Sequence, residues 1–255
     1  MSTVDNINTI LFSGCVFISE LDSNNDPTGF TGSLESTQLS IATEVEEKKI
    51  TSRQCDKFGQ THASVIMPTG AVVAITLLDH SARTLAMNLL GTATENVVAA
   101  NPAATEENPV LTSTLWVKLA HRNIDASGFT GGSATSLTDY TVGVDFELNA
   151  AAGMVRRIEG GAILDGDEIF CNYATLGYTE ARVDGGTKSQ TNVSIRLEGV
   201  NQVDGSQGTL LIPKAVLRPD GEMDFMSGEF LENALTGDIV TVPGSTVSYT
   251  FSTYS

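Results

Sequence analysis

Alternation of apolar and polar residues, with a period of two, is the feature that most constrains what this chain can fold into. It runs through four separate segments, residues 38–48, 140–148, 191–198 and 246–252. Side chains of a β-strand point alternately to opposite faces, so each segment predicts a strand with one apolar and one polar face. In the first segment the polar face consists of Gln38, Ser40, Glu44, Glu46 and Lys48.

Two further runs, residues 71–78 and 210–217, are apolar on both faces. This pattern predicts strands in the interior of a sheet, although Pro213 indicates an edge or a bulge in the second run. Turn sequences such as Asp-Gly-Gly at 184–186 separate the strands, as hairpins require. The sequence therefore predicts an all-β fold, arranged as a β-sandwich or a barrel-like structure.

One segment has the pattern of a short α-helix. Residues 82–89 place apolar side chains on one helical face, Asp79 or Ser81 can cap the N-terminus, and Gly91 can end the helix. The following residues, 92–109, contain two prolines and an acidic pair, and predict a long surface insertion between two β-rich halves. We expect a single domain over residues 1–255, interrupted by this insertion.

The net charge argues against one class of function. With 31 acidic and 14 basic residues the chain carries −17, which disfavours proteins that hold nucleic acid by neutralising phosphates. No stretch approaches the about 18 apolar residues that a membrane span needs, and no export signal is recognised at the N-terminus. The three cysteines, Cys15, Cys55 and Cys171, are widely spaced and predict free thiols in a reducing compartment.

The sequence lacks the motifs of common catalytic and metal sites. It contains no GxSxG, P-loop, HExxH or GxGxxG motif, and its three histidines are not near cysteines at zinc-ligand spacing. Asp22, Asn24 and Asp26 resemble the start of a calcium loop, but Pro27 replaces the turn glycine and Ser33 replaces the bidentate glutamate. We therefore expect no catalytic residues, no metal and no cofactor, and predict a protein that is not an enzyme.

The order of several segments resembles that of bacteriophage major tail tube proteins. The resemblance rests on SGCVFISE (13–20), LLDHSARTLAMNLLG (77–91), LTDYTVGVDFELNAAAGMVRRI (137–158), EIFCNYAT (168–175), VSIRLEGVNQVDG (193–205) and TLLIPKAVLRP (209–219). It implies a virion protein whose sheets continue between subunits, forming rings of six that stack helically into a tube. It further implies assembly in the bacterial host cytoplasm, a tape measure protein and tail-end proteins as partners, and a lumen through which DNA passes without specific binding.

Two sets of residues are candidates for this assembly. The loop 51–62 carries Arg53, Asp56, Lys57 and Phe58 between two long strands and is the candidate contact between subunits or rings; the alternative is an ordinary hairpin loop. The polar face Gln38, Ser40, Glu44, Glu46 and Lys48 is the candidate lumen surface, where carboxylates would repel DNA phosphates. The alternative is that this face simply meets solvent.

Other classes of function stay open. A monomeric β-sandwich that binds carbohydrate or protein would show similar strands and turns, although one tryptophan and five tyrosines offer little aromatic surface for such recognition. Another phage structural protein, such as a head decoration protein or a tail terminator, is a closer alternative.

Overall fold

A computed structural model of the chain describes residues 10–133, 139–226, 228 and 230–254. In this part the chain is nearly all β with one α-helix, which confirms the predicted fold class. It divides into two compact units: unit 1 comprises the residues up to Thr94 and from Val183 onward, and unit 2 comprises Glu95–Arg182. The structure thus differs from the expected single domain, because residues 95–182 enclose a core of their own.

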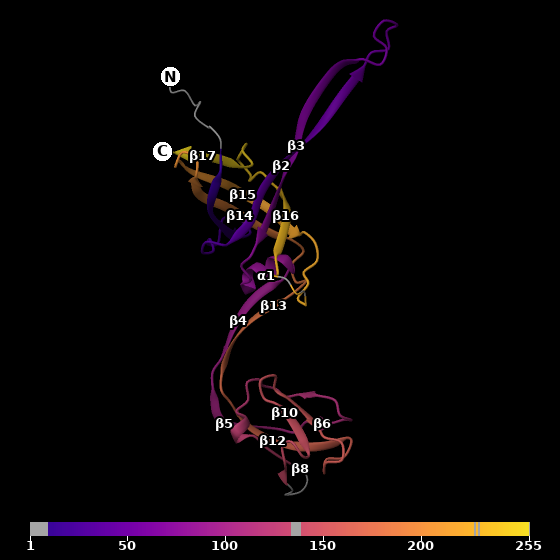
Figure 1. Ribbon diagram of the computed structural model, residues 1–255, viewed down its shortest axis with the longest axis vertical. Coiled ribbons are helices and arrows are strands. Elements are labelled where there is room, and N and C mark those ends of the chain that lie inside the picture. Colours follow the sequence, from indigo (N-terminus) through magenta and orange to yellow (C-terminus); the bar gives the residue numbers. More distant parts are fainter. Residues whose placement is uncertain (1–9, 134–138, 227, 229, 255) are drawn as a thin grey trace. The chain divides into compact units, whose positions relative to one another are not determined.

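Unit 1 is built on one antiparallel sheet (Figure 1). Its strands are β1 (Phe12–Glu20), β2 (Ser36–Thr51), β3 (Thr61–Leu77), β14 (Thr191–Asn201), β15 (Gln207–Pro219), β16 (Asn233–Ile239) and β17 (Thr250–Tyr254). The strand order is β1-β14-β15-β16-β3-β2, and β17 pairs with β15 beyond the end of β16. β2 confirms the strand predicted at 38–48, and β14 confirms the strand predicted at 191–198.

The core of unit 1 lies on the concave side of this sheet. Val16 of β1 and Val73 of β3 belong to the same buried cluster, although their strands stand near opposite ends of the strand order. The sheet must therefore curl around its own apolar face, and Leu34, whose N–H donates to the Val16 carbonyl at 2.8 Å, packs beside the cluster. This curvature makes unit 1 barrel-like, with β1 and β2 at the two edges.

Pro213 lies in a bulge, as its position in an apolar strand predicts. β14 and β15 pair at Val193 with Ala215 and at Ile195 with Ile212, so two residues of β15 face one residue of β14. Such a bulge tolerates proline, which has no N–H to donate to a ladder.

The helix α1 (Ala82–Asn88) confirms the predicted helix, with Ser81 as its N-cap. The Ser81 hydroxyl accepts from the Thr84 N–H at 3.2 Å, whereas the other candidate cap, Asp79, accepts instead from the Glu35 N–H at 2.7 Å. The positive φ at the end of the helix, 46°, belongs to Leu90 and not to Gly91. Gly91 is needed for close packing, since a Cβ there would lie 2.6 Å from the Asp184 carbonyl oxygen.

Unit 2 contains two small antiparallel sheets around a second core. Its elements are β5 (Asn101–Glu107), β6 (Val110–Leu111), β7 (Val117–Lys118), η1 (Ala126–Gly128), β8 (Thr130–Ser133), β9 (Asp139–Tyr140), β10 (Phe146–Asn149), β11 (Met154–Arg157) and β12 (Asp167–Thr175). One sheet has the order β5-β12-β8-β9 with β6 also on β12, and the other has the order β10-β11-β7. Phe129 packs between Phe146 and Tyr173, with ring centroids 5.7 and 5.9 Å away, so aromatic stacking fills the space inside this unit.

Residues 92–109 form strands and not the irregular surface insertion predicted from their prolines. β4 (Thr92–Val98) pairs with β13 (Tyr178–Asp184), and β5 pairs with β12, so both partners lie far away in the sequence. The ladder of β5 on β12 is irregular, because its register shifts between the pairs Tyr173–Thr105 and Thr175–Asn101. An irregular ladder of this kind tolerates a missing N–H donor.

The predicted strand at 140–148 is wrong in its centre. The chain turns at residues 143–145 between β9 and β10; Gly143 has φ 82°, and the Asp145 carboxylate accepts from the Thr141 N–H at 2.8 Å. The C-terminal strand predicted at 246–252 begins later, at Thr250, because residues 243–249 form turns and bends. In both segments the alternation of apolar residues continues through a turn.

Candidate assembly surface

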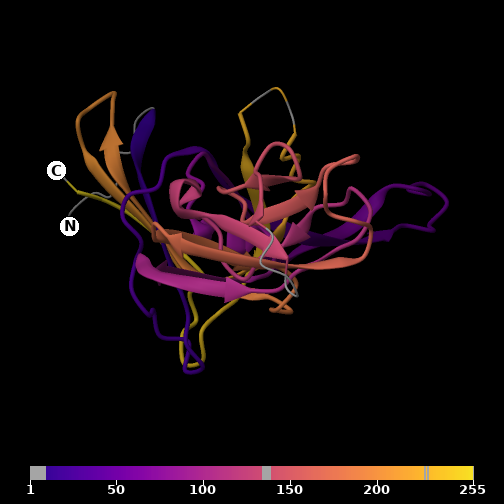
Figure 2. The ribbon, with the colours of Figure 1, turned by 90° about the horizontal axis from the view of Figure 1, so that it is seen from below.

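The most unusual surface of unit 1 is the outer part of the β2–β3 hairpin, residues 44–70, which we call the arm. Here β2 and β3 pair only with each other, from Glu44 opposite Gly70 to Thr51 opposite Thr61. Figure 1 shows the arm extending beyond the sheet, and Figure 2 shows it from a second direction. A two-stranded hairpin has little stability in water by itself, so the arm would gain stability from a surface that covers it.

Large apolar side chains are exposed on both faces of the arm. Each is between 57% and 77% exposed, and they are Val45, Ile50, Phe58, Val65 and Ile66. The register places Ile66 opposite Glu47, on the face that carries Val45, and Val65 opposite Lys48, on the face that carries Ile50. Exposed apolar residues gathered in this way are typical of a protein interaction site.

The backbone edges of the arm are open as well. β2 is the last strand of the sheet order, and β3 pairs with β16 only as far as Val72 opposite Asp238. Within the described residues, both outer edges of the arm therefore lack a neighbouring strand. Unpaired edges of long strands pair readily with other chains unless they are covered.

The five candidate lumen residues share one face of β2, as the alternation predicts. Gln38 and Ser40 lie on the sheet itself, opposite the face from which Leu39 and Ile41 pack on the core; Glu44, Glu46 and Lys48 lie on the arm. All five are exposed. Whether they line a lumen stays a prediction.

Ion pairs partly neutralise the carboxylates of the arm. Glu46 Oε1 lies 3.8 Å from Lys48 Nζ on one face, and Glu47 Oε2 lies 2.8 Å from Lys49 Nζ on the other. The Lys49 ammonium and the Ser64 hydroxyl, which donates to Glu47 Oε1 at 2.6 Å, lower the pKa of Glu47. Glu44 forms no ion pair within the described residues, so its charge remains uncompensated there.

The four candidate contact residues lie together at the end of the arm, in residues 52–60, which we call the arm tip. Arg53, Asp56, Lys57 and Phe58 are all exposed. The turn is closed by backbone hydrogen bonds from Ser52 to Gln60 at 2.8 Å and from Gly59 to Ser52 at 3.0 Å. The sequence thus located the tip, but it did not indicate the apolar residues behind it, because alternation cannot show whether a strand face is covered.

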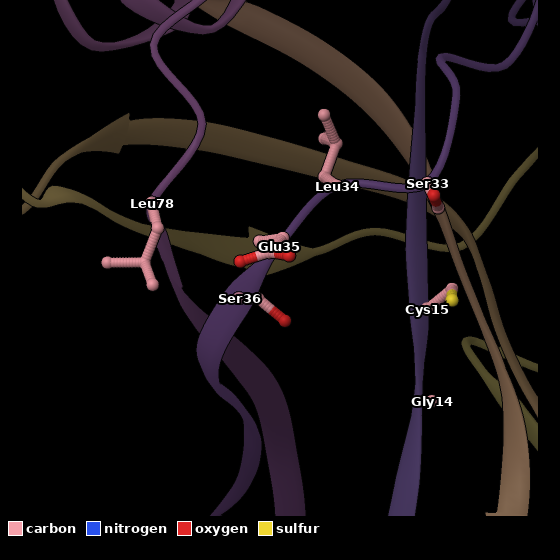
Figure 3. A pocket seen from close by; sticks show the side chains of 7 residues that line it. All are labelled: Gly14, Cys15, Ser33, Leu34, Glu35, Ser36 and Leu78. Atoms are coloured by element: carbon pink, nitrogen blue, oxygen red, sulfur yellow. The ribbon is translucent and has the colours of Figure 1, made fainter.

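A pocket of about 290 Å³ opens at the edge of β1, in the seam between the two ends of the curled sheet (Figure 3). Gly14 and Cys15 form one side, and Glu35, Ser36 and Leu78 face them from the other. Ser33 and Leu34 complete the lining. One thiol and one carboxylate are its ionisable groups, which is too few for a catalytic constellation, so we interpret the pocket as the open edge of the sheet.

A partly buried polar cluster in unit 2 was not predicted. The Tyr173 hydroxyl donates to Glu107, whose carboxylate also accepts from the Ala120 N–H at 3.0 and 3.1 Å. Cys171 is directly opposite Glu107 in the ladder, and burial, followed by the charge of Glu107, raises the pKa of this thiol to about 12. These contacts hold β5 on β12, and a thiol kept protonated in this way is a poor nucleophile.

Other predicted features of the chemistry can be placed. Cys15, Cys55 and Cys171 are free thiols, and the first two are exposed. The Asp22 carboxylate accepts from the N–H groups of Asn24 and Asp26 at 2.8 and 2.9 Å, which forms a tight turn with the carboxylate directed at the backbone. Among the described residues no group of three or more His, Cys, Asp or Glu side chains could hold a metal ion, and no helix there is long and apolar enough to cross a membrane.

Comparison with known proteins places the chain in a family. Residues 9–255 match the family described as "Protein of unknown function UCP028589", and the chain belongs to that family. No curated protein matches the chain.

Proposed function

We propose that this member of the UCP028589 family is a structural protein that polymerises with copies of itself, as the subunit of a bacteriophage tail tube. The observation that carries the proposal is the arm, a long hairpin with apolar residues on both faces and open edges on both sides. A monomer would leave this surface in water. A polymer of identical copies covers it and completes the sheet at the same time.

The energetics favour a repeating contact over an isolated pair. Five large apolar side chains of the arm are more than half exposed, and burying the rest of their surface would contribute on the order of 5–9 kcal/mol. Bringing two proteins together costs about 4–15 kcal/mol, so one arm contact is marginal. Closure of a ring, in which each copy gives and receives an arm, adds contacts without a proportional increase in that cost.

The distribution of charge also supports contact through the arm. The arm contains four basic residues, Lys48, Lys49, Arg53 and Lys57, and four acidic residues, Glu44, Glu46, Glu47 and Asp56, so its formal charge is zero. The whole charge of −17 is therefore carried by the remaining residues. Copies of the chain repel one another in general, and the arm is a region where that repulsion is absent.

The arm contact is heterologous, because the hairpin of one copy meets a different surface of the next. Heterologous contacts close into rings when the rotation allows it and otherwise continue as open stacks. Together with the resemblance to tail tube proteins, this favours hexameric rings stacked into a tube through which DNA passes. The tape measure protein and the tail-end proteins are the further partners we propose, and no catalysis is involved.

Electron microscopy of the purified chain at high concentration tests the proposal. We expect rings or tubes for the unaltered chain. The test variant has residues 47–66 replaced by the dipeptide Asn-Gly. Glu46 and Met67 pair directly in the native hairpin, so in the variant a two-residue turn that suits a hairpin joins them. This variant should remain monomeric and keep a β-rich circular dichroism spectrum, reduced only by the strand residues removed with the arm.

A matched control alters an exposed apolar residue elsewhere on unit 1. Val203, in the turn between β14 and β15, is 54% exposed, so Val203→Ser changes the apolar surface without touching the arm and should assemble normally. Monodisperse monomers of the unaltered chain at every concentration would defeat the proposal and favour a monomeric binding module. If the arm-replaced variant assembles into the same rings, the arm is not the contact that holds the copies together.

A further inference from the structure

A second exposed apolar surface of unit 1 lies in the connection between β15 and β16, residues 220–232, which we call the acidic loop. Its sequence contains five carboxylates and no lysine or arginine. Phe225, Met226 and Phe230 are 64%, 92% and 97% exposed. Large apolar side chains so fully in water, next to charges of one sign, are typical of a docking site for a partner with the opposite charge.

The base of the acidic loop is firmly held. Leu231 accepts a hydrogen bond from His80 through its carbonyl oxygen, 2.6 Å from Nε2, and the Asp220 N–H donates to the Ala234 carbonyl at 3.0 Å. Next to it, buried Asn233 donates to the Thr84 carbonyl at 2.8 Å and so ties the start of β16 to α1. The apolar side chains of the loop are thus presented on a fixed base.

The arm tip has the complementary chemistry. It carries Arg53 and Lys57, which form no ion pair within the described residues, and Phe58, which is 77% exposed. Counting Asp56, the formal charge of the tip is +1, in a chain whose total is −17. An aromatic side chain flanked by two cations matches an acidic surface that also exposes phenylalanine and methionine.

The two surfaces cannot meet within one copy. The arm tip precedes Thr61, the first residue of β3, whereas the acidic loop is followed directly by Asn233, which pairs with Leu77, the last residue of β3. A strand of 17 residues separates them by on the order of 50 Å. Any contact between the tip and the loop therefore joins two molecules, head to tail.

We propose that the arm tip of one copy docks on the acidic loop of a second copy. This inference rests on the proposed function, because it names the surface that receives the arm. Phe58 packs among Phe225, Met226 and Phe230, while Arg53 and Lys57 lie against the carboxylates of the loop. Because donor and acceptor surfaces stand at opposite ends of β3, each added copy presents a new acceptor, and the contact continues along a row of copies.

Disulfide trapping tests the contact, because the arm tip already contains an exposed thiol, Cys55. Gly228→Cys places a second thiol in the acidic loop, where a Cβ meets no atom within 4 Å, and Cys15→Ser removes the other exposed thiol. Copper phenanthroline with dissolved oxygen accepts the two electrons as the thiols join. A bond requires the Cα atoms to approach within about 7 Å, so only docked surfaces are trapped.

The expected result is a ladder of covalent oligomers containing a disulfide between Cys55 and the cysteine at position 228, identified by mass spectrometry. Docking raises the local thiol concentration from micromolar to millimolar, so the disulfide should form faster than in the control by on the order of 1,000-fold. The control carries Val203→Cys in place of Gly228→Cys, with Cys15→Ser retained. Cys55→Ser in the Gly228→Cys chain should abolish the mixed disulfide.

Charge reversal provides a second, independent readout. Glu222→Lys with Asp224→Lys should weaken assembly at least about tenfold, and Arg53→Glu with Lys57→Glu should restore it in the same chain. Tubes that form with no trapping above the control and no restoration would overturn this inference and leave the proposed function standing. An unaltered chain that neither assembles nor is trapped would overturn both.

Discussion

The buried amide of Asn233 gives a stability test of the two-unit organisation. Its Nδ2 donates to the Thr84 carbonyl and its Oδ1 accepts from Asn88 Nδ2, both at 2.8 Å, and the side chain is fully buried. Asn233→Ala removes both hydrogen bonds and leaves the Thr84 carbonyl and the Asn88 amide without these partners. Two net hydrogen bonds and a partly unsatisfied buried group correspond to about 2–3 kcal/mol of lost stability in unit 1.

The two units can be observed separately because the single tryptophan, Trp116, belongs to unit 2. The Arg156 guanidinium lies 4.7 Å from the centre of its ring, so unfolding of unit 2 should change its fluorescence. With a urea dependence of about 2 kcal/mol per M, Asn233→Ala should lower the midpoint for unit 1 by about 1–1.5 M. This shift should be seen by far-ultraviolet circular dichroism and not by tryptophan fluorescence.

The reciprocal variant provides the control. Tyr173→Phe removes the hydroxyl that donates to Glu107 in unit 2 and should cost about 1 kcal/mol, visible in tryptophan fluorescence. If each variant moves both signals together, the units unfold as one body and the separate-core reasoning is refuted. A midpoint change below about 0.3 M for Asn233→Ala would show that the amide network contributes little.

Two further predictions concern titratable groups. Burial raises the folded-state pKa of Cys171 from 9.0 to about 12, so the contribution of this thiol to stability is complete below about pH 9 and is lost as the pH rises toward 12. Ellman titration should detect two thiols in the native chain and three after unfolding. Three reactive thiols in the native chain would contradict this prediction. Glu44→Gln with Glu46→Gln should increase the retention of DNA in assembled tubes without affecting assembly, because two carboxylates of the proposed lumen lose their charge; unchanged passage of DNA would exclude the lumen assignment.

The strands with one buried face could be predicted because their pattern is local. β2 and β14 follow the alternation, Ser81 caps the helix, and Pro213 occupies a bulge. The break at Gly143 could not be predicted from the alternation, since the apolar residues on either side keep the period of two. The turn is held by a hydrogen bond from the Thr141 N–H to the Asp145 carboxylate. The presence of an aspartate in the sequence does not by itself distinguish such a turn from a strand.

Pairings between distant segments could not be predicted from one sequence. The partners of β4 and β5 follow after about 65 to 90 residues, and the two prolines between 92 and 109 indicated a loop. The division into two units follows from these pairings. The acidic loop has a visible signal, five carboxylates beside large apolar residues, but the sequence alone does not show whether those apolar residues are covered.

The arm shows how a pattern of strand residues indicates the number of covering surfaces. On the sheet, Leu39 and Ile41 of β2 are apolar on the side that packs on the core, and the other side is polar. In the arm, residues 44–70, the apolar residues occupy both faces, with Val45 and Ile66 on one face and Ile50 and Val65 on the other. A hairpin laid on one neighbour would need a single apolar face. Two apolar faces fit an arm whose outer end, from Val65 and Ile66 to the tip, is inserted between two surfaces, while Glu44 and Glu46 nearer the sheet stay uncovered. In the assembly we propose, each arm therefore meets more than one neighbouring surface, of which the acidic loop receives only the tip.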